Sequence, residues 1–185
     1  REYQQLVYDW NQPNNDYPEN KTIQPIFEDP VARAPDNVAI IYEDTRLTYK
    51  ELNQRANQLA HYLRVTYQIQ GDDLIALYLD RSEYMLIAIL ATLKSGAAYV
   101  PIDPDYPYER IKYILQDIQA KVVLINERHT SKLVDMIENY NAQNDGLNTK
   151  KPLQIGTLAI DSIELDVSTL LEPSVKNPEV NITSN

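Results

Sequence analysis

The sequence predicts an α/β fold in which a mostly parallel sheet carries helices on both faces. Four short apolar segments alternate with stretches of helical periodicity, and this alternation is typical of parallel sheets because each helix returns the chain to the same end of the sheet. Within these segments apolar residues follow one another without polar interruption, which indicates strands covered on both faces. The expected strands are Leu74–Leu79, Ala98–Ile102, Val122–Ile125 and Leu158–Ile163.

The composition limits the class of protein and its partners. With 185 residues, 43% hydrophobic and 24% charged, the chain is an ordinary globular sequence of one-domain size. A net charge of -10 argues against a nucleic-acid partner, which needs a basic surface. The chain has no cysteine, so disulfides, thiolate metal sites and a cysteine nucleophile are excluded. Without a membrane-length apolar run or a signal-peptide pattern, we expect a cytoplasmic protein and no membrane partner.

A linker and a helix are expected at the start of the chain. Residues 1–21 are polar and rich in Asn and Pro, which is typical of an inter-domain linker, with a short helix over Glu2–Trp10 that docks on the main body. Thr22 is the expected N-cap of a second helix, which Pro30 should kink or end. The apolar face of this helix comprises Ile23, Ile26, Phe27 and Val31.

A hairpin and a long amphipathic helix come next. Residues 37–42 and 46–49 are predicted strands around a turn at residues 43–45. A helix begins at Lys50, with apolar residues at a helical period. Its expected buried positions are Leu52, Ala56, Leu59, Ala60 and Leu63.

The most informative helix–strand unit follows the first expected strand of the parallel sheet. Ser82–Lys94 is apolar on nearly every face, as expected of a helix within a layered core. Gly96 is placed to end this helix in the left-handed conformation. Pro101 and Pro104 close the strand after it, because proline cannot donate to a sheet ladder.

Two further helices complete the pattern, and polar sequence follows them. Pro107 fits the first turn of one of them. Residues 141–152 are a predicted loop, and no clear periodicity is found from Leu170 onward. The expected buried faces are Ile111, Ile114, Leu115 and Ile118 in the first helix, and Leu133, Met136, Ile137 and Tyr140 in the second.

The placement of glycine excludes the common phosphate-binding loops. Such loops need several glycines close together, so that backbone N–H groups can approach the anion. The chain has only 4 glycines, Gly71, Gly96, Gly146 and Gly156, and they are widely separated. A Walker loop, a dinucleotide fingerprint and a glycine-rich lid are therefore not expected.

The two histidines and the serine that could carry chemistry have simpler structural roles. His61 lies away from the apolar face of its helix, and His129 lies in a polar stretch, so both are expected to be solvated. Ser82 has no base nearby in the sequence and is expected to cap its helix.

The paired carboxylates also favour a structural role. Asp103 and Asp105 could form a paired-carboxylate site, but the prolines beside them favour turns or a helix cap. Residues 72–73 (Asp-Asp) and 43–44 (Glu-Asp) are expected in solvated turns. The sequence therefore predicts no catalytic, cofactor-binding or metal-binding residue in this chain.

Four segments, in order, resemble the amino-acid adenylation domains of nonribosomal peptide synthetases, which belong to the adenylate-forming enzyme superfamily. Residues 93–104 (LKSGAAYVPIDP) resemble the second core motif of these domains, and residues 47–52 (LTYKEL) resemble the first. Residues 22–41 and 106–111 follow the same family order. The resemblance departs at residues 65–71 (VTYQIQG), where the family commonly has a Gly-Val turn. One such motif is weak evidence, whereas four in order are strong.

The resemblance implies the N-terminal subdomain of an acetyl-CoA synthetase-like fold, incomplete because the family's ATP loop follows a stretch like residues 175–185. Residues 1–21 would join an upstream condensation-type domain, and residues 22–185 would begin the adenylation core. The complete domain would use ATP and Mg²⁺ to convert an amino acid to its adenylate, and would load it on the phosphopantetheine of a carrier domain. An MbtH-like protein is a further partner that the resemblance allows. The matching motifs are framework elements in this family, so the 185 residues alone are expected to be inactive.

Three alternatives stay open. The chain could belong to an acyl-CoA ligase-type enzyme, although the sequence of residues 99–103 (YVPID) favours the peptide-synthetase branch. It could be a non-catalytic interaction module of the same fold. It could also be an unrelated flavodoxin-like protein with a ligand at the carboxyl ends of its strands, which the scarcity of glycine at strand–helix turns disfavours.

An incomplete sheet with an apolar edge also predicts marginal stability or self-association.

Overall fold

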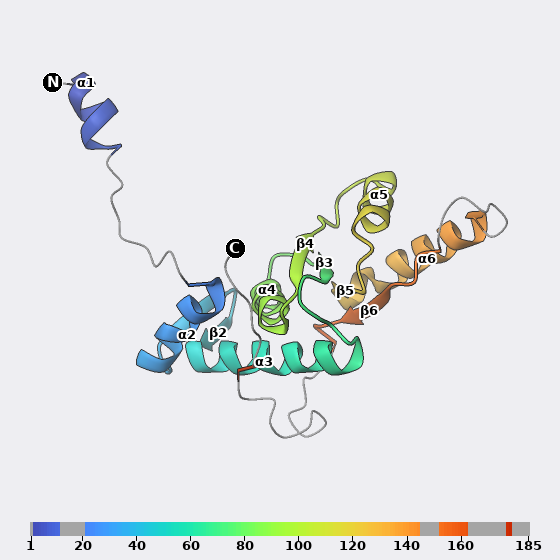
Figure 1. Cartoon of the computed structure of the whole chain (residues 1–185), viewed down its shortest axis with the longest axis horizontal. Helices are drawn as coiled ribbons and strands as arrows, with labels where there is room; N and C mark the ends of the chain where they lie inside the picture. Colours follow the sequence, from blue (N-terminus) through green and yellow to red (C-terminus); the bar gives the residue numbers. More distant parts are fainter. Residues whose placement is uncertain (1, 12–20, 145–151, 163–176, 179–185) are drawn as a thin grey trace.

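A four-stranded parallel sheet forms the centre of the computed structural model, which describes residues 2–11, 21–144, 152–162 and 177–178 (Figure 1). Its strand order is β4-β3-β5-β6, and all three pairings are parallel. The predicted fold class is therefore confirmed. The strands are β3 (Leu74–Tyr78), β4 (Ala98–Pro101), β5 (Val122–Ile125) and β6 (Gly156–Ala159).

Three of these strands differ from their predicted bounds: β3 and β4 each end one residue early, and β6 is shifted. β6 begins at Gly156 instead of Leu158, because the Gly156 N–H already donates to the carbonyl of Lys121 at 3.0 Å. The strand ends at Ala159, and the predicted final residue at position 163 lies outside the described residues.

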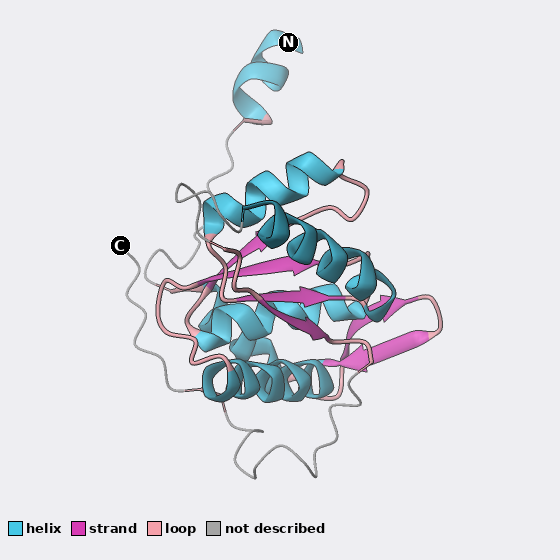
Figure 2. Ribbon diagram, turned by 90° about the vertical axis from the view of Figure 1, so that its right-hand side faces the viewer, coloured by secondary structure: helices cyan, strands magenta, loops and turns pink. Residues whose placement is uncertain are grey.

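Helices cover both faces of the sheet, as the uninterrupted apolar strands predict (Figure 2). α3 (Tyr49–Thr66) and α4 (Glu83–Ser95) pack on one face, and α5 (Tyr108–Ile118) and α6 (Glu127–Asn144) pack on the other. Successive strand residues point to opposite faces, so each strand supplies both cores. The strand residues in the α3–α4 core include Ile75, Leu77, Val122 and Leu124; those in the α5–α6 core include Ala76, Tyr78, Val123 and Ile125.

The segment LTYKEL joins the end of β2 to the start of α3. The Thr48 side chain accepts a hydrogen bond from the Glu51 N–H at 3.2 Å, and the Glu51 carboxylate accepts one from the Thr48 N–H at 2.8 Å. This reciprocal capping box satisfies two N–H groups that the first helical turn leaves without partners. All five predicted buried residues of α3 are buried. The segment is thus a framework element, as the resemblance implies.

Gly96 ends α4 in the left-handed conformation, with φ of 94°, which confirms the predicted cap. Gly96→Val should lower the free energy of unfolding by about 1–3 kcal/mol, because a β-branched side chain is strained there. Urea denaturation measures this loss. Gly71→Ala is the matched control, since a Cβ at Gly71 meets open space. Equal stability of Gly96→Val and the unsubstituted chain would contradict the prediction.

The hairpin predicted before α3 is also present. β1 (Val38–Tyr42) pairs antiparallel with β2 (Thr45–Thr48). The turn between them comprises Glu43 and Asp44, one residue shorter than predicted because Thr45 already belongs to β2, and Glu43 adopts a positive φ of 49°.

Two expectations for the N-terminal part are wrong: an end of the second helix at Pro30, and docking of the first helix on the main body. α2 (Ile23–Arg33) continues through Pro30, because the proline lies near the helix end and costs one internal hydrogen bond, while the Pro30 carbonyl still accepts from Ala34 N–H at 2.9 Å. Only part of its apolar face is covered: Phe27 packs against the core, whereas Ile23 and Ile26 are exposed.

The first described helical segment does not dock on the main body. It consists of α1 (Glu2–Gln4) and the π-helical turn η1 (Gln5–Asp9). Its large apolar side chains are all exposed, because a segment of barely two turns presents too small an apolar face to hold itself on a surface. These side chains are Tyr3, Leu6, Val7, Tyr8 and Trp10.

The edges of the sheet are less open than the sequence suggests. In β4 the N–H groups of Ala98 and Ile102 point toward β3. Because backbone groups alternate in direction along a strand, those of Tyr99 and Pro101 face away from β3, and proline has no N–H that could pair with another strand. On β6, the Ala159 carbonyl accepts from the Ser162 hydroxyl at 3.2 Å. These features weaken the case for self-association, which stays a prediction.

Candidate functional site

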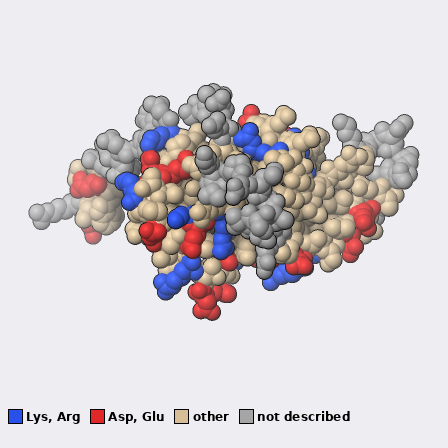
Figure 3. All heavy atoms as spheres, turned by 90° about the horizontal axis from the view of Figure 1, so that it is seen from below, with Lys and Arg blue, Asp and Glu red and all other residues tan. Residues whose placement is uncertain are grey.

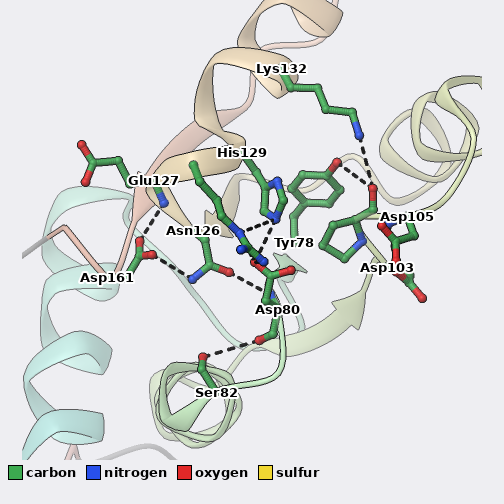
Figure 4. A network of polar contacts seen from close by, with 12 residues as sticks. Tyr78, Asp80, Ser82, Asp103, Asp105, Asn126, Glu127, His129, Lys132 and Asp161 are labelled. Carbon is green, nitrogen blue, oxygen red and sulfur yellow. Dashed lines mark hydrogen bonds and ion pairs between the residues drawn. The ribbon is translucent and has the colours of Figure 1, made fainter.

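The carboxyl edge of the sheet is the place where a ligand is expected. From β3 the chain passes to β4 on one side and then to β5 on the other, so the strand order reverses between β3 and β5. Open α/β sheets bind ligands in the crevice at such a switch point. Here, polar residues follow three strands and lie together: Asp80 after β3, Asn126 after β5 and Asp161 after β6 (Figure 4).

Asn126 joins the ends of these three strands. Its side chain is buried, and its Oδ1 accepts a hydrogen bond from the Asp80 N–H at 2.8 Å. Its Nδ2 donates to Asp161 Oδ2 at 2.9 Å. The other carboxylate oxygen of Asp161 accepts from the Glu127 N–H at 2.7 Å, at the first residue of α6. A carboxylate from this chain therefore occupies the position at the helix N-terminus that would attract an anion.

Asp80 is held by two side chains of α6. Its Oδ2 accepts from Arg128 Nε at 2.7 Å and lies 2.9 Å from His129 Nε2. The His129 ring packs edge-to-face on Tyr78, with ring centroids 5.5 Å apart. Burial tends to raise the pKa of Asp80, but the hydrogen bonds from Arg128 and His129 outweigh it and hold this pKa below its ordinary value.

Asp80→Asn should lower the free energy of unfolding by about 1–2 kcal/mol at pH 7, because the charged hydrogen-bond acceptor is lost. A depressed folded-state pKa gives stability that is present above the unfolded-state value and is lost as pH falls through the folded-state value. The difference in the free energy of unfolding between the variant and the unsubstituted chain should therefore shrink from pH 5 down to pH 2. Urea denaturation across this range measures it, with Asp135→Asn on the exposed side of α6 as control. A difference that does not depend on pH would contradict the assignment.

The structure brings several of the candidate residues to this edge. Asp103 Oδ1 accepts from the Asp105 N–H at 2.9 Å, so the predicted turn is confirmed. Ser82 occupies the N-cap position of α4, but its hydroxyl donates to the Asp80 carbonyl at 3.5 Å instead of capping the helix. The solvated role expected for His129 is wrong, because Asp80 and the Tyr78 ring hold it. Asp80 lies far from His129 in the sequence, and only the shared edge brings the two together.

The remaining candidates lie elsewhere. His61 is half-buried on α3. Asp73 is not merely solvated, since its carboxylate accepts from the Gln70 N–H at 2.6 Å and from Lys121 Nζ at 2.7 Å. Asp72 adopts a positive φ of 66° in the turn beside it.

Other features of the described residues do not suggest a second site. A cavity of about 450 Å³ lies at the opposite edge of the sheet, and no acid, lysine, arginine or histidine lines it. Its lining residues are Gln116, Gln119, Ala120, Tyr140, Pro152, Leu153, Gln154 and Ile155. No three potential metal ligands among His, Asp and Glu come together in the described parts of the chain. None of the helices described has the length and apolar character needed to cross a membrane.

The charge on the surface is mixed. On the face seen in Figure 3, acidic and basic side chains lie interspersed among uncharged ones. Together with the net charge of -10, this gives no broad basic surface on that face for nucleic acid.

Comparison with known families removes one of the three alternatives. Residues 27–180 match the AMP-binding enzyme family. The chain belongs to this family. Because the match covers most of the chain, membership of the adenylate-forming enzymes is confirmed, and an unrelated flavodoxin-like protein is excluded.

Large synthases contain similar segments. The chain is 50% identical over 129 residues to N-(5-amino-5-carboxypentanoyl)-L-cysteinyl-D-valine synthase of Amycolatopsis lactamdurans. These residues make up 70% of this chain and 4% of that protein. It is 45% identical over 128 residues to bacitracin synthase 2 of Bacillus licheniformis, covering 69% and 5% respectively. The chain thus spans only a few per cent of the length of these relatives.

Two solved structures have the same fold as this chain. The N-terminal domain of FACL13 from Mycobacterium tuberculosis superposes with a TM-score of 0.71 and 22% identity, over 88% of this chain and 39% of that one. An artificially fused adenylation-PCP di-domain from Klebsiella oxytoca gives a TM-score of 0.57 and 24% identity, over 75% and 23%. At these identities the likeness establishes the fold alone.

ATP, the nucleotide that the family implies, does not fit the residues described here. The Asp80 carboxylate already takes up Arg128 and His129 at the switch point, and Asp161 already occupies the N-terminus of α6. The strand–helix turns of the described sheet contain no cluster of glycines to admit phosphate oxygens. We therefore assign no step of nucleotide chemistry to these residues.

Proposed function

We propose that this chain is the N-terminal part of an adenylation domain of the peptide-synthetase type and that it supplies framework to that domain. The complete domain would activate an amino acid with ATP and Mg²⁺ and transfer it to the phosphopantetheine of a carrier domain. The observation that carries the proposal is the 50% identity to a segment of a peptide synthase. The polar groups at the carboxyl edge of the sheet form hydrogen bonds with one another, and this supports a framework role.

The domain bounds and partners belong to the same proposal. Residues 1–21 serve as a linker from a condensation-type domain, and residues 22–185 begin the adenylation core. Two features support a separate linker: the exposed apolar side chains of α1 and η1, and the start of the family match at residue 27. An MbtH-like protein and a cytoplasmic location complete the proposal.

Amino-acid-dependent ATP–pyrophosphate exchange tests the proposal. We expect no exchange by the 185 residues with any proteinogenic amino acid, and exchange by the polypeptide extended through the full open reading frame. Exchange by the 185 residues alone would overturn the framework role. A folded extended protein that exchanges with no amino acid would instead favour the interaction module. Activation of a fatty acid with transfer to free coenzyme A would favour an acyl-CoA ligase.

A further inference from the structure

A buried lysine lies where α2, α3 and α4 meet. Lys94 belongs to the mostly apolar helix α4 and is only 3% exposed. Its ammonium forms an ion pair with Glu28 of α2. It also lies 3.3 Å from the side-chain oxygen of Asn177. An ammonium with three N–H donors needs such acceptors when water is excluded.

The Asn177 oxygen is the meeting point of three donors. Besides Lys94, Asn57 Nδ2 donates to it at 2.9 Å and Asn53 Nδ2 at 3.3 Å, both from α3. These residues are 83 to 124 positions away from Asn177 in the sequence, so the contacts are not local. A cavity of about 180 Å³ lies beside them, lined by Thr22, Gln24, Pro25, Glu28, Lys94, Asn177 and Pro178.

We propose that Asn177 is a latch, and that Lys94, Asn53 and Asn57 form a niche selective for one carbonyl-type oxygen. The niche presents cationic and amide N–H groups from two helices, and an apolar side chain there would remove the one oxygen that all three donors contact. An oxygen at this point satisfies all three donors at once. The latch fixes residues 177–178 against the α3–α4 side of the sheet, next to the start of α2.

The latch makes a specific prediction about access to Lys94. Asn177→Leu keeps a side chain of similar size but removes the oxygen, so residues 177–178 should leave the niche and expose the Lys94 amine. Asn177→Asp keeps an acceptor oxygen beside the ammonium and should hold the latch closed. Labelling with acetic anhydride, read by peptide mass spectrometry, reports the amine directly. Labelling of Lys94 relative to the partly exposed Lys121 should rise about fivefold or more in Asn177→Leu and stay near the unsubstituted value in Asn177→Asp.

Asn141→Leu is the matched control. The Asn141 amide also holds a distant segment, accepting from the Leu153 N–H at 2.8 Å and donating to its carbonyl at 3.1 Å, but on the opposite side of the sheet. This variant should leave the labelling of Lys94 relative to Lys121 unchanged. Unchanged labelling of Lys94 in Asn177→Leu would overturn the latch. Equal labelling in Asn177→Asp and Asn177→Leu would overturn the selectivity for an oxygen, and a rise in Asn141→Leu would show general loosening instead of a latch.

Discussion

Glu28→Ala is expected to lower the free energy of unfolding by about 3–5 kcal/mol, because it leaves the buried ammonium of Lys94 without its charged partner. The Asn177 oxygen remains as an acceptor, but it is neutral and cannot compensate a full charge. Urea denaturation of the purified chain measures the loss as a lower midpoint at unchanged slope. The adjacent substitution Asp29→Ala is the control, because the Asp29–Lys21 pair is about half exposed and such exposed pairs contribute little to stability.

The pH dependence of this loss identifies its cause. Burial holds the pKa of Lys94 below its ordinary value, and Glu28 partly offsets this by favouring the charged form. Removing Glu28 lowers this pKa further. A neutral amine costs much less to bury than an ammonium. The difference in unfolding free energy between the variant and the unsubstituted chain should therefore narrow as pH rises from 7 toward 10. The double variant Lys94→Met with Glu28→Leu should recover most of the stability, since apolar residues can replace a buried pair. A loss no larger than that of Asp29→Ala would contradict this account.

The sequence predicted those parts of the fold that depend on periodicity and on special backbone conformations. The strands around Ile75 and Val123 follow from uninterrupted apolar runs, and the buried side of α3 follows from its helical period. Gly96 follows from the need for a left-handed residue after an apolar helix. These features are local, so a single segment contains the information that determines them.

The polar contacts between distant segments could not be predicted in the same way. Lys94 belongs to a helix that is apolar on nearly every face, so its charge could have indicated a buried ion pair, but nothing in the sequence identifies Glu28 as the partner. Asp80 and His129 are 49 residues apart, and they meet because β3 and β5 are neighbours. A polar residue directly after each buried strand was the available signal, since parallel strands bring their carboxyl ends to one edge.

Asn126→Leu should be the second most damaging substitution, with a loss of about 2–4 kcal/mol in the free energy of unfolding. It removes the acceptor for the Asp80 N–H and the donor to Asp161, and it leaves buried polar groups of two strand ends without partners. Asn126→Asp separates the two effects. It keeps an oxygen for the Asp80 N–H, but it loses the donor and places two carboxylates together, so we expect a loss of similar size at pH 7.

Exchanging the two side chains gives the decisive test. In the double variant Asn126→Asp with Asp161→Asn, the new carboxylate accepts from the Asp80 N–H and from the new amide at position 161. The oxygen of that amide still accepts from the Glu127 N–H. Every hydrogen bond of the junction is thus restored, with the direction of the bond between positions 126 and 161 reversed, at the same total charge. The double variant should recover most of the stability that Asn126→Asp loses, with a coupling of about 1–3 kcal/mol in a double-mutant cycle. Additive losses at the two positions would mean that Asn126 and Asp161 act independently, and the polar junction at the carboxyl edge would then not be a single unit.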